Sequence, residues 1–133
     1  MSKTRTITLT DRAPIKIRED DWPQIAVSTY SDHDNQYEFQ ANRTWKCAIR
    51  VRQHEDGRAV VYGVYDYDTA HQNENGFAAK AGVLVEAGAD LARAIREVAD
   101  TLTDAATEAG HEFGAHISAA AREAIADLPA VEI

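Results

Sequence analysis

Residues 45–67 read WKCAIRVRQHEDGRAVVYGVYDY, and this stretch decides the fold. Apolar and polar residues alternate on both sides of Asp56 and Gly57, as is typical of strands with one buried face. An Asp-Gly pair between two such runs favours a two-residue type I′ turn, in which both residues adopt positive φ. The stretch therefore predicts a β-hairpin at the centre of an antiparallel sheet.

The predicted turn also sets the register of the hairpin. With Asp56 and Gly57 as the loop, Glu55 faces Arg58 and Cys47 faces Asp66, so every side chain is assigned to one face. The expected buried face holds Cys47, Ile49, Val51, Val60, Tyr62 and Val64. The expected exposed face holds Lys46, Ala48, Arg50, Arg52, His54, Ala59, Val61, Gly63, Tyr65 and Tyr67.

Two helices are predicted after the hairpin. Apolar residues recur at helical spacing from Leu91 to Ala109, which predicts a helix over about 89–109 that stops near Gly110. A second helix is predicted over about 112–127, ended by Pro129. Its expected inner face holds Phe113, Ile117, Ala120, Ala124 and Leu128.

The remaining segments give weaker patterns. Period-two alternation in residues 6–10 and again at Ile15 and Ile17 indicates two short strands or one interrupted strand. Acidic residues before Trp22 and Pro23 favour a short helix over about 21–29. Residues 31–42 are polar and predict an exposed loop, whereas residues 81–85 predict a short buried strand.

Together these elements predict a single α+β domain over residues 1–133, with the two helices covering one side of the antiparallel sheet. We expect Leu91, Ile95, Val98, Leu102, Phe113 and Ile117 to meet Ile49, Val51, Val60, Tyr62 and Val64. The order of hairpin, loop, strand and helix in Lys46–Val64 followed by Ala81–Val98 resembles that of HicB-type antitoxins. The resemblance concerns the order of elements and implies an antitoxin-like module as one interpretation.

Composition restricts the classes of function. The 133 residues carry a net charge of -8, which disfavours binding of the whole chain to nucleic acid or anionic membranes and favours a basic partner. Cys47 is the single cysteine, so no internal disulfide forms and we expect a cytoplasmic protein. No apolar run of signal-peptide or membrane-spanning length is present.

Carboxylates form a row on the solvent side of the first predicted helix. The row comprises Asp90, Glu97, Asp100, Asp104 and Glu108, and Glu112, Glu123 and Asp127 of the second helix supplement it. Like charges at helical spacings of three and four cost helix stability, so the row invites a functional explanation. We expect a non-enzymatic interaction protein that binds a basic partner, for example inhibiting a nucleic-acid-handling protein by charge mimicry.

Two other functions remain open from the sequence. The first is a small nucleic-acid-binding or antitoxin-like module that uses the exposed face of the hairpin, with Lys46, Arg50, Arg52, His54, Tyr65 and Tyr67 as its residues. The second is an enzyme with a dispersed site at Asp32, His33, Asp34, Asp66 and Asp68. The sequence leaves homo-oligomerisation open.

No catalytic, cofactor or metal motif supports an enzyme. His111 and His116 stand five residues apart, whereas the zinc-protease helix motif needs histidines four apart on one face. Cys47 falls on the expected core side of its strand, where a neutral thiol is unreactive. The glycines form neither a phosphate loop nor a dinucleotide fingerprint, so we expect no cofactor and no metal.

Overall fold

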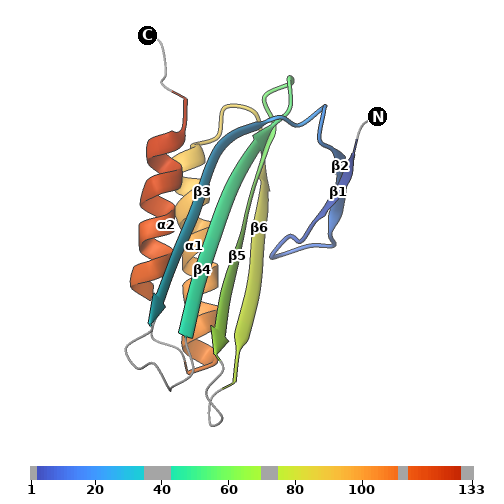
Figure 1. Ribbon diagram of the computed structural model, residues 1–133. Helices are drawn as coiled ribbons and strands as arrows, with labels where there is room; N and C mark the ends of the chain where they lie inside the picture. The colour runs from blue at the N-terminus through green and yellow to red at the C-terminus, as the bar shows by residue number, and fades with distance from the viewer. Residues whose placement is uncertain (1–2, 35–42, 70–74, 111–113, 130–133) are drawn as a thin grey trace.

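The computed structural model describes residues 3–34, 43–69, 75–110 and 114–129. The fold is α+β: a four-stranded antiparallel sheet in the order β3-β4-β5-β6, two helices on one of its faces, and a separate two-stranded hairpin (Figure 1). The strands are β1 Thr4–Ile7, β2 Ile15–Arg18, β3 Gln24–Asp34, β4 Arg43–Gln53, β5 Ala59–Thr69 and β6 Phe77–Val85. The helices are α1 Leu91–Glu108 and α2 Gly114–Asp127.

The central hairpin is confirmed, but its predicted register is wrong by one residue. Gln53 faces Ala59, and Cys47 faces Tyr65. The His54 N–H donates to the Arg58 carbonyl at 2.9 Å, and the Gly57 N–H donates to the His54 carbonyl at 2.9 Å. Only Gly57 has positive φ in this turn, at 96°, so the loop has three residues and ends on a left-handed glycine instead of forming a type I′ turn.

The shift of one residue exchanges the two faces of β5. Tyr65 and Tyr67 turn toward the helices and are buried, at 0% and 2% exposure, whereas Tyr62 and Val64 turn to the opposite face. The predicted contact of Val60, Tyr62 and Val64 with the helices is therefore wrong. The alternation of apolar and polar residues could not reveal the wrong register, because β5 carries apolar residues on both faces.

The main core lies between the sheet and the two helices. Ile95, Val98 and Leu102 of α1 and Ile117 of α2 are fully buried there, as predicted, against Ile49 and Val51 of β4. A Cβ at Gly63 of β5 would lie 3.1 Å from both Val98 Cγ1 and Leu102 Cδ1. The absence of a side chain at Gly63 thus lets α1 lie close to the sheet. Phe113 lies outside the described residues.

Both helix predictions are confirmed within a few residues. Asp90 caps α1, since its Oδ1 accepts a hydrogen bond from the Arg93 N–H at 3.2 Å. Gly110 follows the helix with φ of 86°, a conformation that costs little only for glycine.

The predicted helix over residues 21–29 is wrong, because residues 24–34 form strand β3. The acidic residues and Pro23 that resemble a helix start instead lie at the turn that leads into this strand, where the Pro23 carbonyl accepts from the Gln53 N–H at 3.0 Å. The following residues are rich in β-branched and aromatic side chains, and pairing with β4 decides their structure. Residues 31–34 continue the strand, so the predicted loop is wrong there, while residues 35–42 lie outside the described residues.

The two short N-terminal strands are confirmed and build a second, smaller core. Ile7, Leu9, Ile17 and Trp22 surround Val60 on the sheet face opposite the helices. We call this opposite side the open face. The β1–β2 hairpin covers only one end of it, so the rest of the open face stays exposed (Figure 1).

Candidate functional site

The carboxylates of α1 form a ridge on the side of the helix that faces away from the sheet. We define the acidic ridge as Glu97, Asp100, Asp104 and Glu108, all of which are exposed. Arg93 Nε lies 3.5 Å from Glu97 Oε1, an exposed pair one helical turn apart that contributes little to stability. Asp100, Asp104 and Glu108 make no ion pair with any residue in the described ranges.

Two arginines reduce the negative charge at one end of the ridge. Asp100 shares a depression of about 260 Å³ between α1 and α2 with Arg96 and Arg122. Neither arginine lies within ion-pair distance of a described carboxylate. The strongest uncompensated charge is therefore at Asp104 and Glu108, toward the C-terminal end of α1, where the helix dipole is also negative.

Three residues expected beside the ridge do not extend it. Asp90 is the helix cap described above. Glu123 and Asp127 of α2 point to the edge strand β3: Asp127 Oδ2 accepts the Val27 backbone N–H at 2.8 Å, and Glu123 Oε2 accepts the Ser28 hydroxyl at 2.8 Å. Glu112 lies outside the described residues.

His116 makes a further contact between α2 and the edge strand β3. Its Nε2 lies 3.2 Å from Asp32 Oδ2, and its ring stacks on Trp45 with centroids 5.2 Å apart. His116, Glu123 and Asp127 thus form a polar seam that fastens α2 to the edge of the sheet. The sequence predicted Glu123 and Asp127 on the polar side of the second helix, but nothing in it indicated that a strand edge faces that side.

The expected nucleic-acid surface on the hairpin is not present as a unit. Tyr65 and Tyr67 lie in the main core, and Arg52 is only 8% exposed. Arg52 donates to the Trp22 carbonyl at 3.1 Å and to the Tyr62 hydroxyl at 2.9 Å, which is a structural role.

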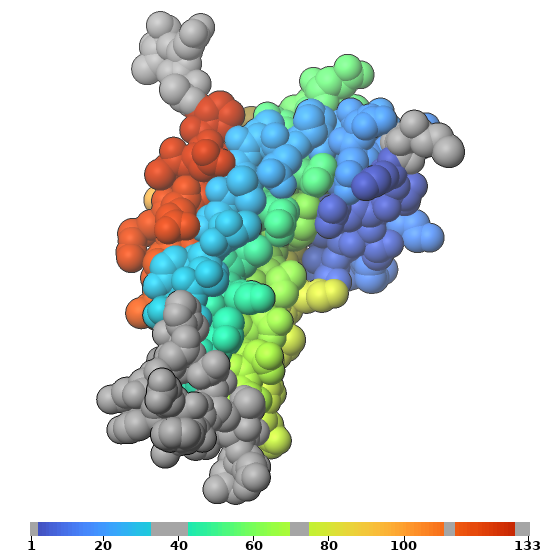
Figure 2. Space-filling view, viewed as in Figure 1, coloured from blue at the N-terminus to red at the C-terminus, as the bar shows by residue number. Residues whose placement is uncertain are grey.

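The other three residues of that expected surface are His54, Lys46 and Arg50. His54 lies at the central turn, where its ring packs against Trp22 at 5.1 Å and its Nδ1 lies 3.1 Å from Asp56 Oδ2. Lys46 and Arg50 stay on the open face, which Figure 2 shows beside the β1–β2 hairpin. Lys80 of β6 joins them there because it pairs with Val64, although sequence reasoning missed it.

The described acids of the expected dispersed enzyme site lie on both faces of the sheet. Asp32 lies on the helix side of β3, where it contacts His116. Asp66 and Asp68 lie on the open face of β5, while His33 and Asp34 end β3. Within the described ranges, no three metal-ligating side chains gather at one place.

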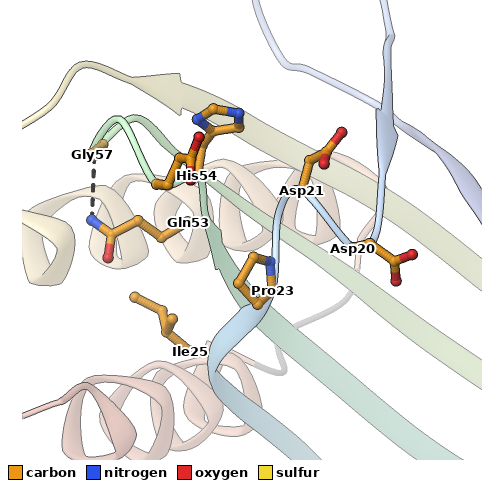
Figure 3. A pocket seen from close by; sticks show the side chains of 8 residues that line it. Asp20, Asp21, Pro23, Ile25, Gln53, His54 and Gly57 are labelled. Atoms are coloured by element: carbon orange, nitrogen blue, oxygen red, sulfur yellow. Dashed lines mark hydrogen bonds between the residues drawn. The ribbon is translucent and has the colours of Figure 1, made fainter. Parts of the chain in front are cut away.

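A shallow depression of about 580 Å³ lies at the end of the sheet near the central turn. Figure 3 shows Asp20 and Asp21 on one side of it, Gln53 and His54 on the other, and Pro23 between them. The nearby Asp56 carboxylate has a lowered pKa, because it accepts hydrogen bonds from the Arg58 backbone and side chain. The residues that line the depression supply carboxylates and one imidazole but no Ser, Thr or Cys side chain.

Cys47 lies in the main core, as predicted, with 1% exposure. Burial raises the pKa of its thiol to about 12, so the thiol stays protonated and unreactive at neutral pH. Burial also raises the pKa of Tyr65, which faces Cys47 across β4 and β5.

None of the helices in the described ranges is both long enough and apolar enough to cross a membrane. Comparison with known proteins gives no significant match: no family model, no curated protein and no solved structure matches this chain. The functional interpretation therefore depends on the surfaces described above.

Proposed function

We propose that this chain is a non-enzymatic interaction protein whose acidic ridge binds a basic protein partner. The observation that carries the proposal is the set of exposed carboxylates at Asp100, Asp104 and Glu108, which make no ion pair with the described residues. Their shared face points away from the sheet, so a partner can reach it without unfolding any element. Charge of this kind mainly increases association rate and specificity.

The spacing of the ridge favours a partner that handles nucleic acid. Asp100, Asp104 and Glu108 follow one another at four-residue intervals, about 6 Å apart on a helix. A rigid line of negative charge on a protein resembles a nucleic-acid strand in its field, so a groove lined with Lys and Arg would accept it. Occupation of that groove would inhibit the partner by competition.

A comparison of two charge-neutralised variants tests the proposal. The ridge variant carries Asp100→Asn, Asp104→Asn and Glu108→Gln; Glu97 is kept because it already pairs with Arg93. The control variant carries Asp20→Asn, Asp21→Asn and Glu55→Gln, three exposed acids at the opposite end of the sheet. Both variants lose the same net charge.

Each tagged protein is used to capture partners from an extract of its native cell, and the captured proteins are quantified by mass spectrometry. We expect wild type and the control variant to retain the same basic protein, and the ridge variant to lose most of it. Equal capture by all three proteins would refute the proposal.

A further inference from the structure

The open face of the sheet carries three cations beside two acids, in a chain whose net charge is -8. Lys46, Arg50 and Lys80 lie there, and no ion pair joins them to a carboxylate of the described residues. Lys46 and Lys80 are exposed, and Arg50 is half-buried. Asp66, directly across from Lys46, and Asp68 are the acids of β5 on this face.

These three cations, which we call the open-face cations, surround a centre of small and aliphatic side chains. Ala48 lies between Lys46 and Arg50 on β4 and faces Val64, which in turn faces Lys80. A hollow of about 360 Å³ opens beside Ala48 and is lined by Thr29, Ser31 and Lys46 among others. The open face therefore offers a recess with Lys46 in its wall.

We propose that the acidic ridge of a second copy of this chain docks on the open face. The inference rests on the proposed function in one respect, because it uses the same acidic ridge and names one basic surface that the ridge fits. The open face and the ridge carry opposite charges, and they lie on opposite sides of the two-layer fold (Figure 1).

The spacing of the charges also agrees. Lys46 and Arg50 are four residues apart on a strand, about 13 Å at roughly 3.3 Å per residue. Asp100 and Glu108 are eight residues apart on a helix, about 12 Å at 1.5 Å per residue. A helix laid along β4 can therefore place one carboxylate near each cation, with Asp104 over the Ala48 recess.

Nucleic acid is the less suitable occupant of this face. Sequence-tolerant single-strand binding relies on aromatic side chains on which bases stack, and Tyr65 and Tyr67 of the hairpin are buried.

Because the two surfaces differ, the contact is head-to-tail, and a pair of copies keeps one free ridge and one free face, so further copies can add. Association of the purified chain should therefore grow with concentration and decrease with salt. Sedimentation at about 100 µM protein, in the range that detects micromolar association, measures this in about 20 mM and about 500 mM NaCl. We expect species larger than the 14.6 kDa monomer only at the lower salt.

Two variants give the decisive experiment. The ridge variant described above keeps its open face, and a face variant with Lys46→Gln, Arg50→Gln and Lys80→Gln keeps its ridge. We expect each variant alone to be monomeric at low salt, with an unchanged circular dichroism spectrum. An equimolar mixture should form a 1:1 complex that does not grow further, because only one competent contact remains.

A monomeric wild type at low salt would overturn the inference, as would a mixture that forms no complex or variants that associate alone as wild type does. If wild type is monomeric and binds a labelled single-stranded oligonucleotide, and only the face variant loses this binding, the open face would be assigned to nucleic acid instead. None of these results decides the proposed function, because capture of a basic protein by the ridge is measured independently in the native extract.

Discussion

The carboxylate of Asp127 accepts a hydrogen bond at 2.8 Å from the backbone N–H of Val27, which lies 100 residues earlier in the chain. An edge strand exposes a row of unpaired backbone groups, and natural proteins cover such edges to prevent pairing with other chains. In this fold the last turn of α2 supplies part of that cover. The contact explains why this acid serves the fold and not the acidic ridge.

We expect Asp127→Ala to lower the free energy of unfolding by about 1 kcal/mol, because a charge-assisted hydrogen bond is lost. Asp127→Asn keeps an acceptor and should lose less. Asp104→Ala is the control, since Asp104 makes no ion pair with the described residues and is exposed. Urea denaturation measures all three, and equal stability of Asp127→Ala and Asp104→Ala would contradict the assignment.

The register of the central hairpin depends on Gly57. Its φ is 96°, and a Cβ at this position would lie 2.8 Å from the Ala87 Cβ. Gly88 has a similar φ of 84° but no atom within 4 Å of such a Cβ. We expect Gly57→Ala to destabilise the protein by at least about 1 kcal/mol more than Gly88→Ala, since only the former adds a clash to the backbone strain. Equal losses in thermal denaturation would argue against the observed turn.

Tyr65 and Tyr62 should respond oppositely to removal of their hydroxyl groups. The Tyr65 hydroxyl is buried and has no hydrogen-bond partner in the described part of the chain, so Tyr65→Phe should maintain or raise stability, by up to about 1 kcal/mol. The Tyr62 hydroxyl accepts from Arg52 Nε at 2.9 Å, so Tyr62→Phe should cost about 1 kcal/mol. A marked loss with Tyr65→Phe would mean that its hydroxyl is bonded in solution.

Alkaline pH should destabilise the protein through Cys47. The folded pKa of its thiol is raised to about 12 from 9.0, so the unfolded chain loses this proton first as pH rises. The contribution of the thiol to stability is complete below pH 9 and decreases between about pH 9 and 12, at up to about 1.4 kcal/mol per pH unit. Denaturation at a series of pH values should show a shallower decrease for Cys47→Ala. Parallel curves for variant and wild type would exclude this origin.

Local signals in the sequence were sufficient for the helices and for the existence of the hairpin. The helix α1 combines an apolar face at helical spacing with the Asp90 cap and the Gly110 stop, and all three signals agree. The register of the central hairpin could not be predicted, because Glu55-Asp56-Gly57 fits a two-residue or a three-residue loop. The neighbouring Val60 and Val61 are both buried, so their apolar character does not distinguish the two registers. Only the second core under the β1–β2 hairpin explains why β5 is apolar on both faces.

The strand β3 and the polar seam on α2 were missed for a different reason. Acids followed by Pro23 suit a helix start or a turn before a strand equally well, and only pairing with β4 decides between them. Likewise, Glu123 and Asp127 lie on a polar helix side whether that side faces water or a strand edge. The candidate site is therefore smaller than predicted and consists of the ridge residues on α1.

The salt dependence of partner binding tests the central claim most directly. The dissociation constant of the captured basic protein is measured from about 50 to about 500 mM NaCl, a range over which exposed charges become screened. If the ridge carries the binding, affinity for wild type should fall steeply with salt, and the variant with Asp100→Asn, Asp104→Asn and Glu108→Gln should bind weakly with a much flatter dependence. Equal affinities and equal salt slopes for the two proteins would contradict the account.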